Sequence, residues 1–488
     1  MYLTHRSIRS FLFSLCVVAG TYPTVSAQNN GSRTRPPRPP ALSLRAPDVM
    51  PGTLPEMRTP AYWISRMSHP DEVVLTLNRI EQMNKDYSNR MAHLENLDSN
   101  AHREVMGQLR EWVGLMAAVP DAAAMAPSEL SAWVSNKIQL ELDFLKKGRF
   151  GNILGIVYSS EEIDKLAEEM AFDRISGNLR AVQGLIVNCA RLRIVPSLNE
   201  ENIGLTNNAS RWDMWNLDIL PVGSLVQVLH ASKTGGFLFV LTERGYGWVR
   251  SEKVAFGKKA DLEQFSQNSD FWLCTGDKVP FYSNPQCKYV SGWFSMGDHL
   301  PAVGGSDHQI KVPVRRINGE LAIETAWLSP DADVHRGYLP YTRKNVVVQA
   351  LKLLDNIYDW TGGWYGRNHV TDLRDIFGCF GFHLPANGVL LSFFNTDSPT
   401  LLHPDQGQQV QYQTILGNPP FLTLQMVSSG HSQLYLGDYN GVPIVFDTHG
   451  YSYKDDQGRD LVVRRCVIGT ISLPNYFLKQ DISFVTLK

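Results

Sequence analysis

The sequence predicts a multidomain protein with a helical N-terminal domain, two small β-barrels and a C-terminal α+β domain. The first observation is length: 488 residues correspond to about three domains. The second is periodicity, since apolar residues recur with a helical period early in the chain and alternate with a period of two further on. The third is the last part of the chain, where helical segments precede strands joined by short turns, a pattern typical of α+β domains.

The first 58 residues lack the pattern of a folded core. Residues 1–27 combine a basic start, an apolar run too short to span a bilayer and a small-residue cleavage site at Val25-Ser26-Ala27, which indicates a secretory signal peptide. Residues 28–58 are rich in proline without apolar periodicity, which indicates an extended linker. We therefore expect an exported protein, secreted or periplasmic, that is not an integral membrane protein.

Residues 59–199 have helical patterns and are interpreted as a structural helical domain. Ser159 and Glu162 have the spacing of a capping box. Two apolar stripes recur at spacings of three and four after the starts Pro70-Asp71 and Pro127-Ser128, namely Val73, Leu77, Ile80 and Met83, and then Leu130, Val134, Ile138, Leu142 and Leu145.

Residues 200–262 and 263–340 each predict a small β-barrel. Short alternating segments at 225–230, 237–240 and 247–250 are separated by Gly and Ser turns in the first. The second has strand-like segments at 271–273, 310–314 and 321–325, and an Asn318-Gly319 hairpin turn. Most aromatic residues of the first barrel are expected to pack its interior, and Tyr246 is retained as a candidate substrate contact.

Residues 341–488 form the predicted α+β domain, whose central stretch is Tyr358–Gly388. A turn-rich approach leads to an amphipathic helix with His369 at its start, and Leu384-Pro385 follows as a stop. The apolar face of the helix comprises Val370, Leu373, Phe377 and Phe380. Several enzymes place a nucleophile at such a helix start, where the helix dipole stabilises a thiolate.

Composition excludes some function classes. The net charge is −2 and the pI about 6.7, so no global charge attracts nucleic acid, and no motif indicates a cofactor. Five cysteines follow the signal peptide, an odd number that leaves at least one unpaired within the chain. Cys274 and Cys287 flank a turn-rich segment and could form a local disulfide; alternatively all five are buried as small apolar residues.

Several motifs, in order, resemble bacterial cell-wall endopeptidases of the NlpC type, which are papain-like cysteine peptidases with an N-terminal stabilising domain and two bacterial SH3-like domains. The resemblance covers residues from about Thr59 to Lys488. Its motifs are Leu339-Pro340-Tyr341-Thr342, Tyr358-x-Trp360-x-Gly362, Arg374-Asp375-x-Phe377, Phe380-Gly381-x-x-Leu384-Pro385-x-Asn387, Gly430-His431, Leu434-Tyr435-Leu436-Gly437 and His449-Gly450.

The resemblance implies cleavage of peptidoglycan stem peptides between D-glutamate and a diamino acid. In the family an Asp-Cys-Ser motif starts the central helix, its Cys is the nucleophile, and two histidines act as base and orienting residue. Carried over, His431 matches the base and His449 the orienting residue. The nucleophile position holds His369. Trp360 and Asn387 fall on substrate-facing positions.

The departures from the family concentrate at the site. Asn368-His369-Val370 replaces Asp-Cys-Ser, and Ala386-Asn387-Gly388 replaces the family's Arg-Asn-Ser. Cys379 lies ten residues beyond His369, on another face of the helix, and is interpreted as a packing residue. A zinc site formed by the three histidines is disfavoured, because a papain-like arrangement places them in a row and metal ligands must converge.

Three functional hypotheses follow. The first is a catalytically degenerate peptidase-like protein that binds peptidoglycan stem peptides or an envelope protein. The second is an active cell-wall hydrolase with altered chemistry based on His369, His431 and His449. The third is an interaction protein or scaffold that acts through its SH3-like domains.

Overall fold

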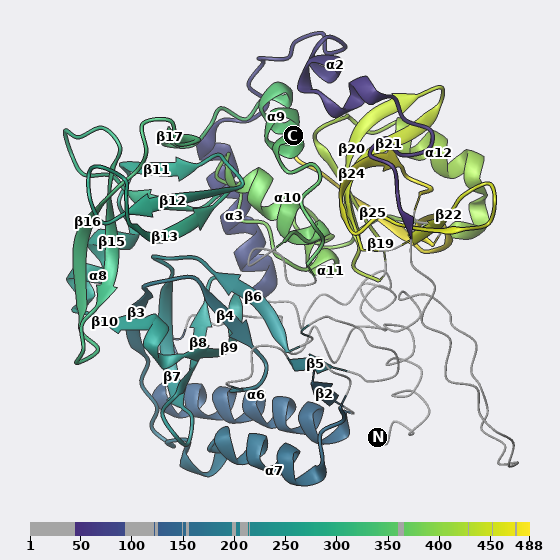
Figure 1. The fold of residues 1–488 in the computed structure, drawn as a ribbon. Coiled ribbons are helices and arrows are strands. Elements are labelled where there is room, and N and C mark those ends of the chain that lie inside the picture. Colours follow the sequence, from purple (N-terminus) through teal and green to yellow (C-terminus); the bar gives the residue numbers. More distant parts are fainter. Residues whose placement is uncertain are drawn as a thin grey trace, which may run out of the picture.

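Figure 1 shows the computed structural model, which describes residues 44–488 except 93–121, 123–124, 149, 153–155, 198–201, 205–212, 214, 360–365, 428, 451 and 474–475. The chain folds into two β-rich modules and a C-terminal α+β domain, with helix α10 near the centre where the three parts meet. The predicted multidomain architecture with a helical part is therefore confirmed. The predicted signal peptide lies outside the described residues.

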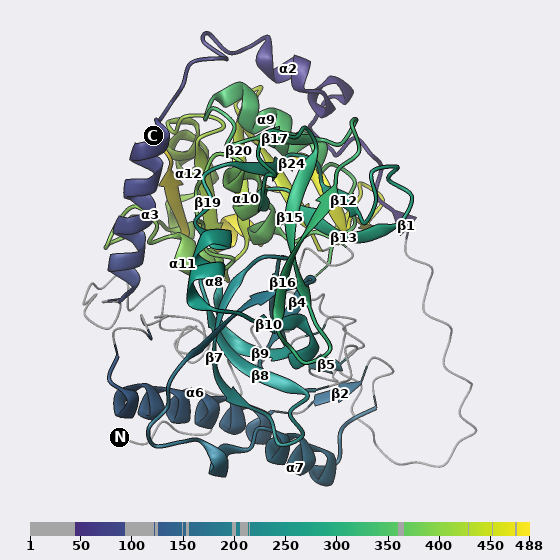
Figure 2. The same cartoon turned by 90° about the vertical axis from the view of Figure 1, so that its left-hand side faces the viewer.

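The N-terminal described segment packs on the C-terminal domain. It contains β1 (Leu44–Arg45), the 3-10 helix η1 (Pro55–Arg58), α2 (Pro60–Ile64) and α3 (Leu77–Ala92). Strand β1 pairs in parallel with a C-terminal strand, and Met57, Trp63 and Ile80 are buried in the C-terminal core. Figure 2 shows α3 running along the outer side of that domain. Residues 44–58, predicted as part of a linker, thus belong to a packed structure.

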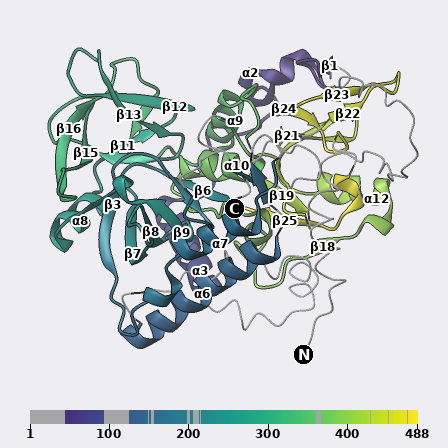
Figure 3. The same cartoon turned by 60° about the horizontal axis from the view of Figure 1, so that its bottom comes forward.

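The first β-module combines two helices with a sheet. Pro127 at the first position of α6 (Pro127–Lys147) suits a helix start because its missing N–H has no partner to lose. Figure 3 shows α6 lying along this module. The predicted apolar stripe of α6 is buried, and α7 (Ser160–Glu169) has the predicted capping box between Ser159 and Glu162.

The sheet of this module has seven strands in the order β10-β3-β7-β8-β9-β4-β6. The strands are β3 (Val182–Ile186), β4 (Ala190–Arg193), β6 (Asn216–Leu220), β7 (Leu225–Ala231), β8 (Phe237–Thr242), β9 (Gly245–Arg250) and β10 (Val254–Phe256). Strands β7, β8 and β9 match the prediction. Strands β3 and β4 fall within residues 59–199, where only helices were expected. Short elements beside the sheet are β2 (Phe150–Asn152), β5 (Asn202–Gly204), η3 (Phe172–Arg174) and η4 (Ser251–Lys253).

Residues 59–199 are therefore divided between two cores. The helices α2 and α3 pack on the C-terminal domain, and α6 and α7 pack on the first module. The reason is physical: an amphipathic helix buries its apolar stripe against whichever sheet or helix offers a complementary face.

The second β-module consists of a four-stranded sheet, β13-β12-β16-β15, and a three-stranded sheet, β14-β11-β17. Helix α8 (Lys259–Ser266) contributes Leu262 and Phe265 to its core. The predicted Asn318-Gly319 turn joins β15 and β16, and Gly319 has the positive φ that such a turn requires. The strands are β11 (Phe271–Cys274), β12 (Lys278–Tyr282), β13 (Val290–Ser295), β14 (His299–Pro301), β15 (Gln309–Arg315), β16 (Leu321–Trp327) and β17 (Val334–Arg336).

The C-terminal domain packs helices on an antiparallel sheet with the order β18-β25-β19-β20-β21-β24. The helices are α9 (Arg343–Lys352), α10 (His369–Gly378), α11 (Gly388–Leu391) and α12 (Gln408–Leu416), with the 3-10 helices η5 (Pro404–Gln406) and η6 (Phe477–Lys479). The strands are β18 (Leu401–Leu402), β19 (Thr423–Val427), β20 (Ser432–Tyr439), β21 (Val442–His449), β22 (Ser452–Lys454), β23 (Asp460–Val462), β24 (Arg465–Thr470) and β25 (Ile482–Thr486).

Two general properties bear on the sequence predictions. Within the described residues, no helix combines the length and apolarity needed to cross a membrane. Cys189, Cys274, Cys287, Cys379 and Cys466 are all free thiols. The Cys274 thiol is buried and donates to the Gly276 carbonyl, so the structure holds no bridge between Cys274 and Cys287.

Candidate functional site

Helix α10 begins at His369, the residue that stands at the nucleophile position. Asn368 caps the helix, because its side chain accepts a hydrogen bond from the Val370 amide at 2.9 Å. Val370, Leu373 and Phe377 of the predicted stripe are buried. The predicted helix start is therefore observed, and His369 projects from the first position of the helix.

The helix ends earlier than the sequence indicated. Gly378 is its last residue, and the chain reverses at Gly381, whose φ of 91° lies in the left-handed region that favours glycine. Leu384-Pro385 therefore follows the reversal and does not stop the helix. Phe380 still joins the core beneath the helix, packed against Tyr341.

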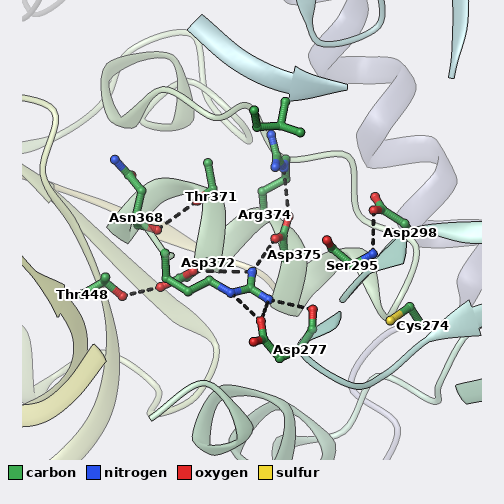
Figure 4. A network of polar contacts seen from close by, with 12 residues as sticks. Cys274, Asp277, Ser295, Asp298, Asn368, Thr371, Asp372, Arg374, Asp375 and Thr448 are labelled. Carbon is green, nitrogen blue, oxygen red and sulfur yellow. Dashed lines mark hydrogen bonds and ion pairs between the residues drawn. The ribbon is translucent and has the colours of Figure 1, made fainter. Parts of the chain in front are cut away.

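A buried ionic network fixes the start of α10. The Arg367 guanidinium donates to Asp375 Oδ2 at 2.6 Å and to Asp277 Oδ1, and lies 3.7 Å from Asp372 Oδ1. Figure 4 shows these three carboxylates converging. Burial by itself lowers the pKa of Arg367, but the carboxylates outweigh it and the net shift is upward. Arg367 therefore stays charged, and its three partners hold the residue two positions before His369.

The same network joins α10 to both β-modules. Asp277 lies in the turn between β11 and β12 of the second module. Arg374 donates to both carboxylate oxygens of Asp218 on β6 of the first module, at 2.8 and 2.9 Å. Backbones also meet closely, since a Cβ added to Gly297 would lie 2.6 Å from the Asp375 carbonyl oxygen. The position of His369 thus depends on contacts from all three parts of the chain.

Asp372 connects the helix to strand β21. Its Oδ2 accepts hydrogen bonds from the Thr448 hydroxyl and, at 3.4 Å, from the Cys466 thiol. Burial raises the pKa of Asp372 to about 7, although Arg367 and the Thr448 hydrogen bond act in the opposite direction. A fully buried carboxyl whose pKa lies near neutrality makes this contact sensitive to pH.

His369 is hydrogen-bonded through its ring. Its Nδ1 accepts the backbone N–H of Ser432 at 3.2 Å. A backbone amide donates and does not accept at its nitrogen, so Nδ1 carries no proton, and we assign the single proton of a neutral imidazole to Nε2. Nε2 then carries the proton, and the lone pair of Nδ1 is engaged by the Ser432 N–H, so neither nitrogen has a lone pair available for attack on a carbonyl group.

His431 and Asp447 form a buried dyad. His431 Nε2 lies 2.8 Å from Asp447 Oδ1, and the Gln433 amide donates to Asp447 Oδ2 at 2.9 Å. The rings of His369 and His431 are 4.2 Å apart between centroids and tilted by 36°. The three side chains therefore stand in a row, His369 then His431 then Asp447, which is the order of a nucleophile, base and orienting acid.

The base position is closed to solvent. His431 is 2% exposed. Phe477 and Tyr476 approach its ring edge-on, with centroid distances of 5.8 and 6.0 Å. These aromatic residues come from the segment around η6, close to the end of the chain and beyond the last of the sequence motifs. A substrate carbonyl could reach His431 only after this packing opened.

The Asn387 side chain has a structural role at the start of α11. It accepts the amides of Val389 and Leu390 at 3.0 Å and so caps α11. The next residue, Gly388, packs against the loop before His431, and an added Cβ would lie 2.0 Å from the Gly430 carbonyl oxygen. The serine that the resembled family carries at this position would not fit.

The other predicted site residues have separate outcomes. Tyr246 is 1% exposed and packs against Trp133 of α6 and Phe239 in the first module, so the structure does not bring it to the histidines. Trp360 lies outside the described residues. His449 ends strand β21, but its side chain is not described, and its orienting role stays a prediction.

Asp447 was missed at the sequence level. It lies two positions before His449 on the same strand, and therefore on the same face. The sequence did contain a sign of this arrangement. Asp447 and His449 are separated by one residue on a predicted strand that follows the strand after His431, so either side chain could face that histidine. The His-Gly motif drew the interpretation to the histidine.

Cys379, the cysteine that follows His369 in the sequence, does not take the place of a reactive thiol. Cys379 is fully buried, its thiol faces the carbonyl oxygens of Asp375 and Cys274, and burial raises its pKa. Within the described residues, no three His, Cys, Asp or Glu side chains are grouped as metal ligands. In the described site, His431 and Asp447 are in contact, and Cys379 is a buried thiol whose pKa is raised.

Comparison with solved structures identifies the fold. The chain is similar to an NlpC/P60 endopeptidase from Photobacterium damselae subsp. piscicida, with 16% sequence identity, a TM-score of 0.67, and coverage of 91% of this chain and 99% of that one. It is also similar to an NlpC/P60 family protein from Bacillus cereus ATCC 10987, at 15% identity and a TM-score of 0.43, over 63% of this chain and 100% of that one. No family model and no curated protein matches the sequence.

The first similarity extends over nearly the whole of both chains and shows that this protein has the fold of an NlpC/P60 endopeptidase. The NlpC-type fold that the sequence motifs predicted is confirmed.

Proposed function

We propose that the protein is a catalytically inactive NlpC/P60-fold protein that binds peptidoglycan without cleaving it. The observation that carries the proposal is the state of His369. The position from which a thiolate would attack holds a neutral imidazole. The lone pair of its Nδ1 is engaged in the hydrogen bond from the Ser432 backbone N–H, and so is not available for attack. The adjacent base is 2% exposed and packed under aromatic side chains.

Peptidoglycan is the proposed ligand for two reasons. The N-terminal pattern of residues 1–27 favours export, and the solved structure with the same fold is described as an endopeptidase of the NlpC/P60 class. Stem peptides are the binding target we favour. The two β-modules, interpreted as SH3-like barrels, are proposed to contact the envelope. A protein of the envelope is the alternative ligand.

Co-sedimentation of the purified mature protein with insoluble peptidoglycan tests the binding. We expect saturable sedimentation with peptidoglycan and none with cellulose, an insoluble polysaccharide without peptides. Removal of the stem peptides from the glycan by an amidase should abolish sedimentation if the peptides are the ligand. Failure to sediment with intact peptidoglycan would contradict the proposal and leave an envelope protein as the ligand.

The His431–Asp447 dyad supports a second candidate, a hydrolase with altered chemistry. The 2.8 Å contact is that of a general base held by an acid, and such a base could activate water. On this alternative, stem-peptide cleavage would be measurable and would fall by about 100-fold or more in both His431→Ala and Asp447→Asn. Equal, background rates in the wild type and both variants would exclude it.

A further inference from the structure

One face of the second β-module carries exposed aromatic side chains. In its four-stranded sheet, β13-β12-β16-β15, neighbouring residues of a strand point to opposite faces (Figure 1). The face toward the module's core carries Val279, Phe281, Phe294 and Ala326, all of which are buried. We call the opposite side the outer face, and the strand register assigns to it Pro280, Tyr282, Val290, Trp293 and Trp327.

The apolar residues of the outer face are contiguous. Tyr282 pairs with Trp327 on one side and with Val290 on the other, so the three side chains form a row across the sheet. Pro280 and Trp293 pair in the neighbouring row. Trp293 and Val290 are each 49% exposed. A contiguous group of exposed apolar side chains on a soluble domain commonly marks an interaction surface.

Two lysines flank the outer face, one at each edge of the sheet. Lys311 lies on β15, diagonally opposite Trp327. Lys288 lies in the turn before β13, where its backbone N–H donates to Asn284 Oδ1 at 3.2 Å. Three spacings between strands separate the two edges, which amounts to about 14 Å. Within the described part of the chain, neither ammonium group pairs with a carboxylate.

We propose that the outer face binds an extended acidic segment of another polypeptide, in which apolar side chains lie between two acidic ones. The apolar side chains of the segment pack on Trp293, Tyr282 and Trp327. Its two carboxylates pair with Lys288 and Lys311. Because an extended chain advances about 3.3 Å per residue, a span of about 14 Å places the acidic residues about four positions apart.

The charges favour this occupant over two others. A second copy of the chain would bring lysines toward lysines, because the same face would supply both sides of a symmetric contact. Anionic lipid surfaces are bound through clusters of about four to eight basic residues, whereas two lysines flank this face. The outer face includes none of the residues around His369, so the inference is independent of the proposed function.

A peptide array probed with the full-length mature chain tests the chemistry of the partner. The immobilised pentapeptides have Asp at both ends and all combinations of Leu, Val, Tyr and Trp at the three central positions. Matched sets have Asn or Lys at both ends. An antibody raised against the chain detects bound protein, and fluorescence anisotropy then gives the Kd of the strongest Asp-ended peptide in solution.

Two variants and two matched controls locate the binding. The variants are Trp293→Ala and Lys311→Gln. Ile317→Ala removes a fully exposed apolar side chain from the same module, in the turn between β15 and β16. Lys259→Gln removes one positive charge from α8, where the Lys259 side chain is 75% exposed. Circular dichroism checks that each variant is folded, and Lys311→Gln keeps the test decisive if Trp293→Ala is not.

We expect stronger signals from Asp-ended than from Asn-ended peptides, and none from Lys-ended ones. The Kd should rise about tenfold in Trp293→Ala, which loses an aromatic contact, and about threefold in Lys311→Gln, which loses an exposed ion pair. It should stay unchanged in both controls. Equal signals from Asp- and Asn-ended peptides, or equal Kd values in the variants and their controls, would overturn the proposal.

Two further measurements separate the other occupants. Light scattering of the chain alone detects a dimer, and flotation with phosphatidylglycerol vesicles detects a lipid surface. We expect a monomer and no flotation. A dimer that dissociates in Trp293→Ala would assign the outer face to a second copy, and flotation lost in that variant would assign it to a membrane; either result would overturn the acidic peptide as its occupant.

Discussion

Replacing Asp372 by asparagine is predicted to remove a pH dependence from the stability of the C-terminal domain. The carboxyl is fully buried and its pKa is raised from 3.8 to about 7. Below about pH 4 the group is protonated in both the folded and the unfolded chain, so its burial does not lower the free energy of unfolding. As pH rises from about 4 to about 7, the unfolded chain releases the proton first, and the folded state loses stability.

The size of the effect follows from the shift. A change in the pKa of Asp372 from 3.8 to about 7 corresponds to about 4 kcal/mol in the free energy of opening the structure around it. The Asp372→Asn variant keeps an acceptor for the Thr448 hydroxyl but has no charge to desolvate. Its stability should therefore stay nearly constant over this range, and at pH 8 it should exceed that of the wild type.

Hydrogen exchange followed by mass spectrometry measures this locally, on the peptide that covers α10 (His369–Gly378). Protection is compared at pH 4.5, 6, 7 and 8 after correction for intrinsic exchange rates. Asp405→Asn, at an exposed position of η5, serves as the matched control. Parallel pH profiles for the wild type and Asp372→Asn, or a variant less stable at pH 8, would refute the reasoning.

Three further predictions concern the site. Arg367→Ala should destabilise the domain by about 3–5 kcal/mol in chemical denaturation, because it leaves buried carboxylates unpaired. Arg459→Ala, which removes a side chain that is 55% exposed in its ion pair, should cost under about 1 kcal/mol. Gly388→Ala should cost about 1–3 kcal/mol by the same assay, since its Cβ would meet the Gly430 carbonyl oxygen. His369→Cys alone should give no cleavage of stem peptides by chromatography, because the base beside it remains covered.

The sequence predicted local elements well where a strong period and a start signal coincide. The helix start at His369, the capping box at Ser159 and the strands β7 to β9 are found as expected. Each depends on residues within one or two turns of helix or one strand. Such signals are local by nature.

The packing between distant segments could not be predicted from such local signals. Trp63 joins the core of a domain that begins far along the chain, and an apolar stripe does not specify its partner. Strands β3 and β4 are short, and their apolar residues also fit a helix turn. Contacts across domains, such as Arg374 with Asp218, depend on how the modules pack.

The candidate site shows the same division. Motif spacing located His369 and His431, which the structure brings within 4.2 Å between ring centroids. The contact between His431 and Asp447 depends on the relative position of β20 and β21, and the cover by Phe477 depends on a segment that follows the last motif. Neither the contact with Asp447 nor the cover by Phe477 can be predicted from the spacing of the motifs.

The central claim is that the nucleophile position cannot support cleavage. Its most direct test is a digestion time course of purified peptidoglycan with the wild-type protein and His431→Ala, followed by chromatography and mass spectrometry of soluble fragments. We expect neither protein to release stem-peptide fragments above the level found without protein. Release by the wild type that is lost in His431→Ala would contradict it.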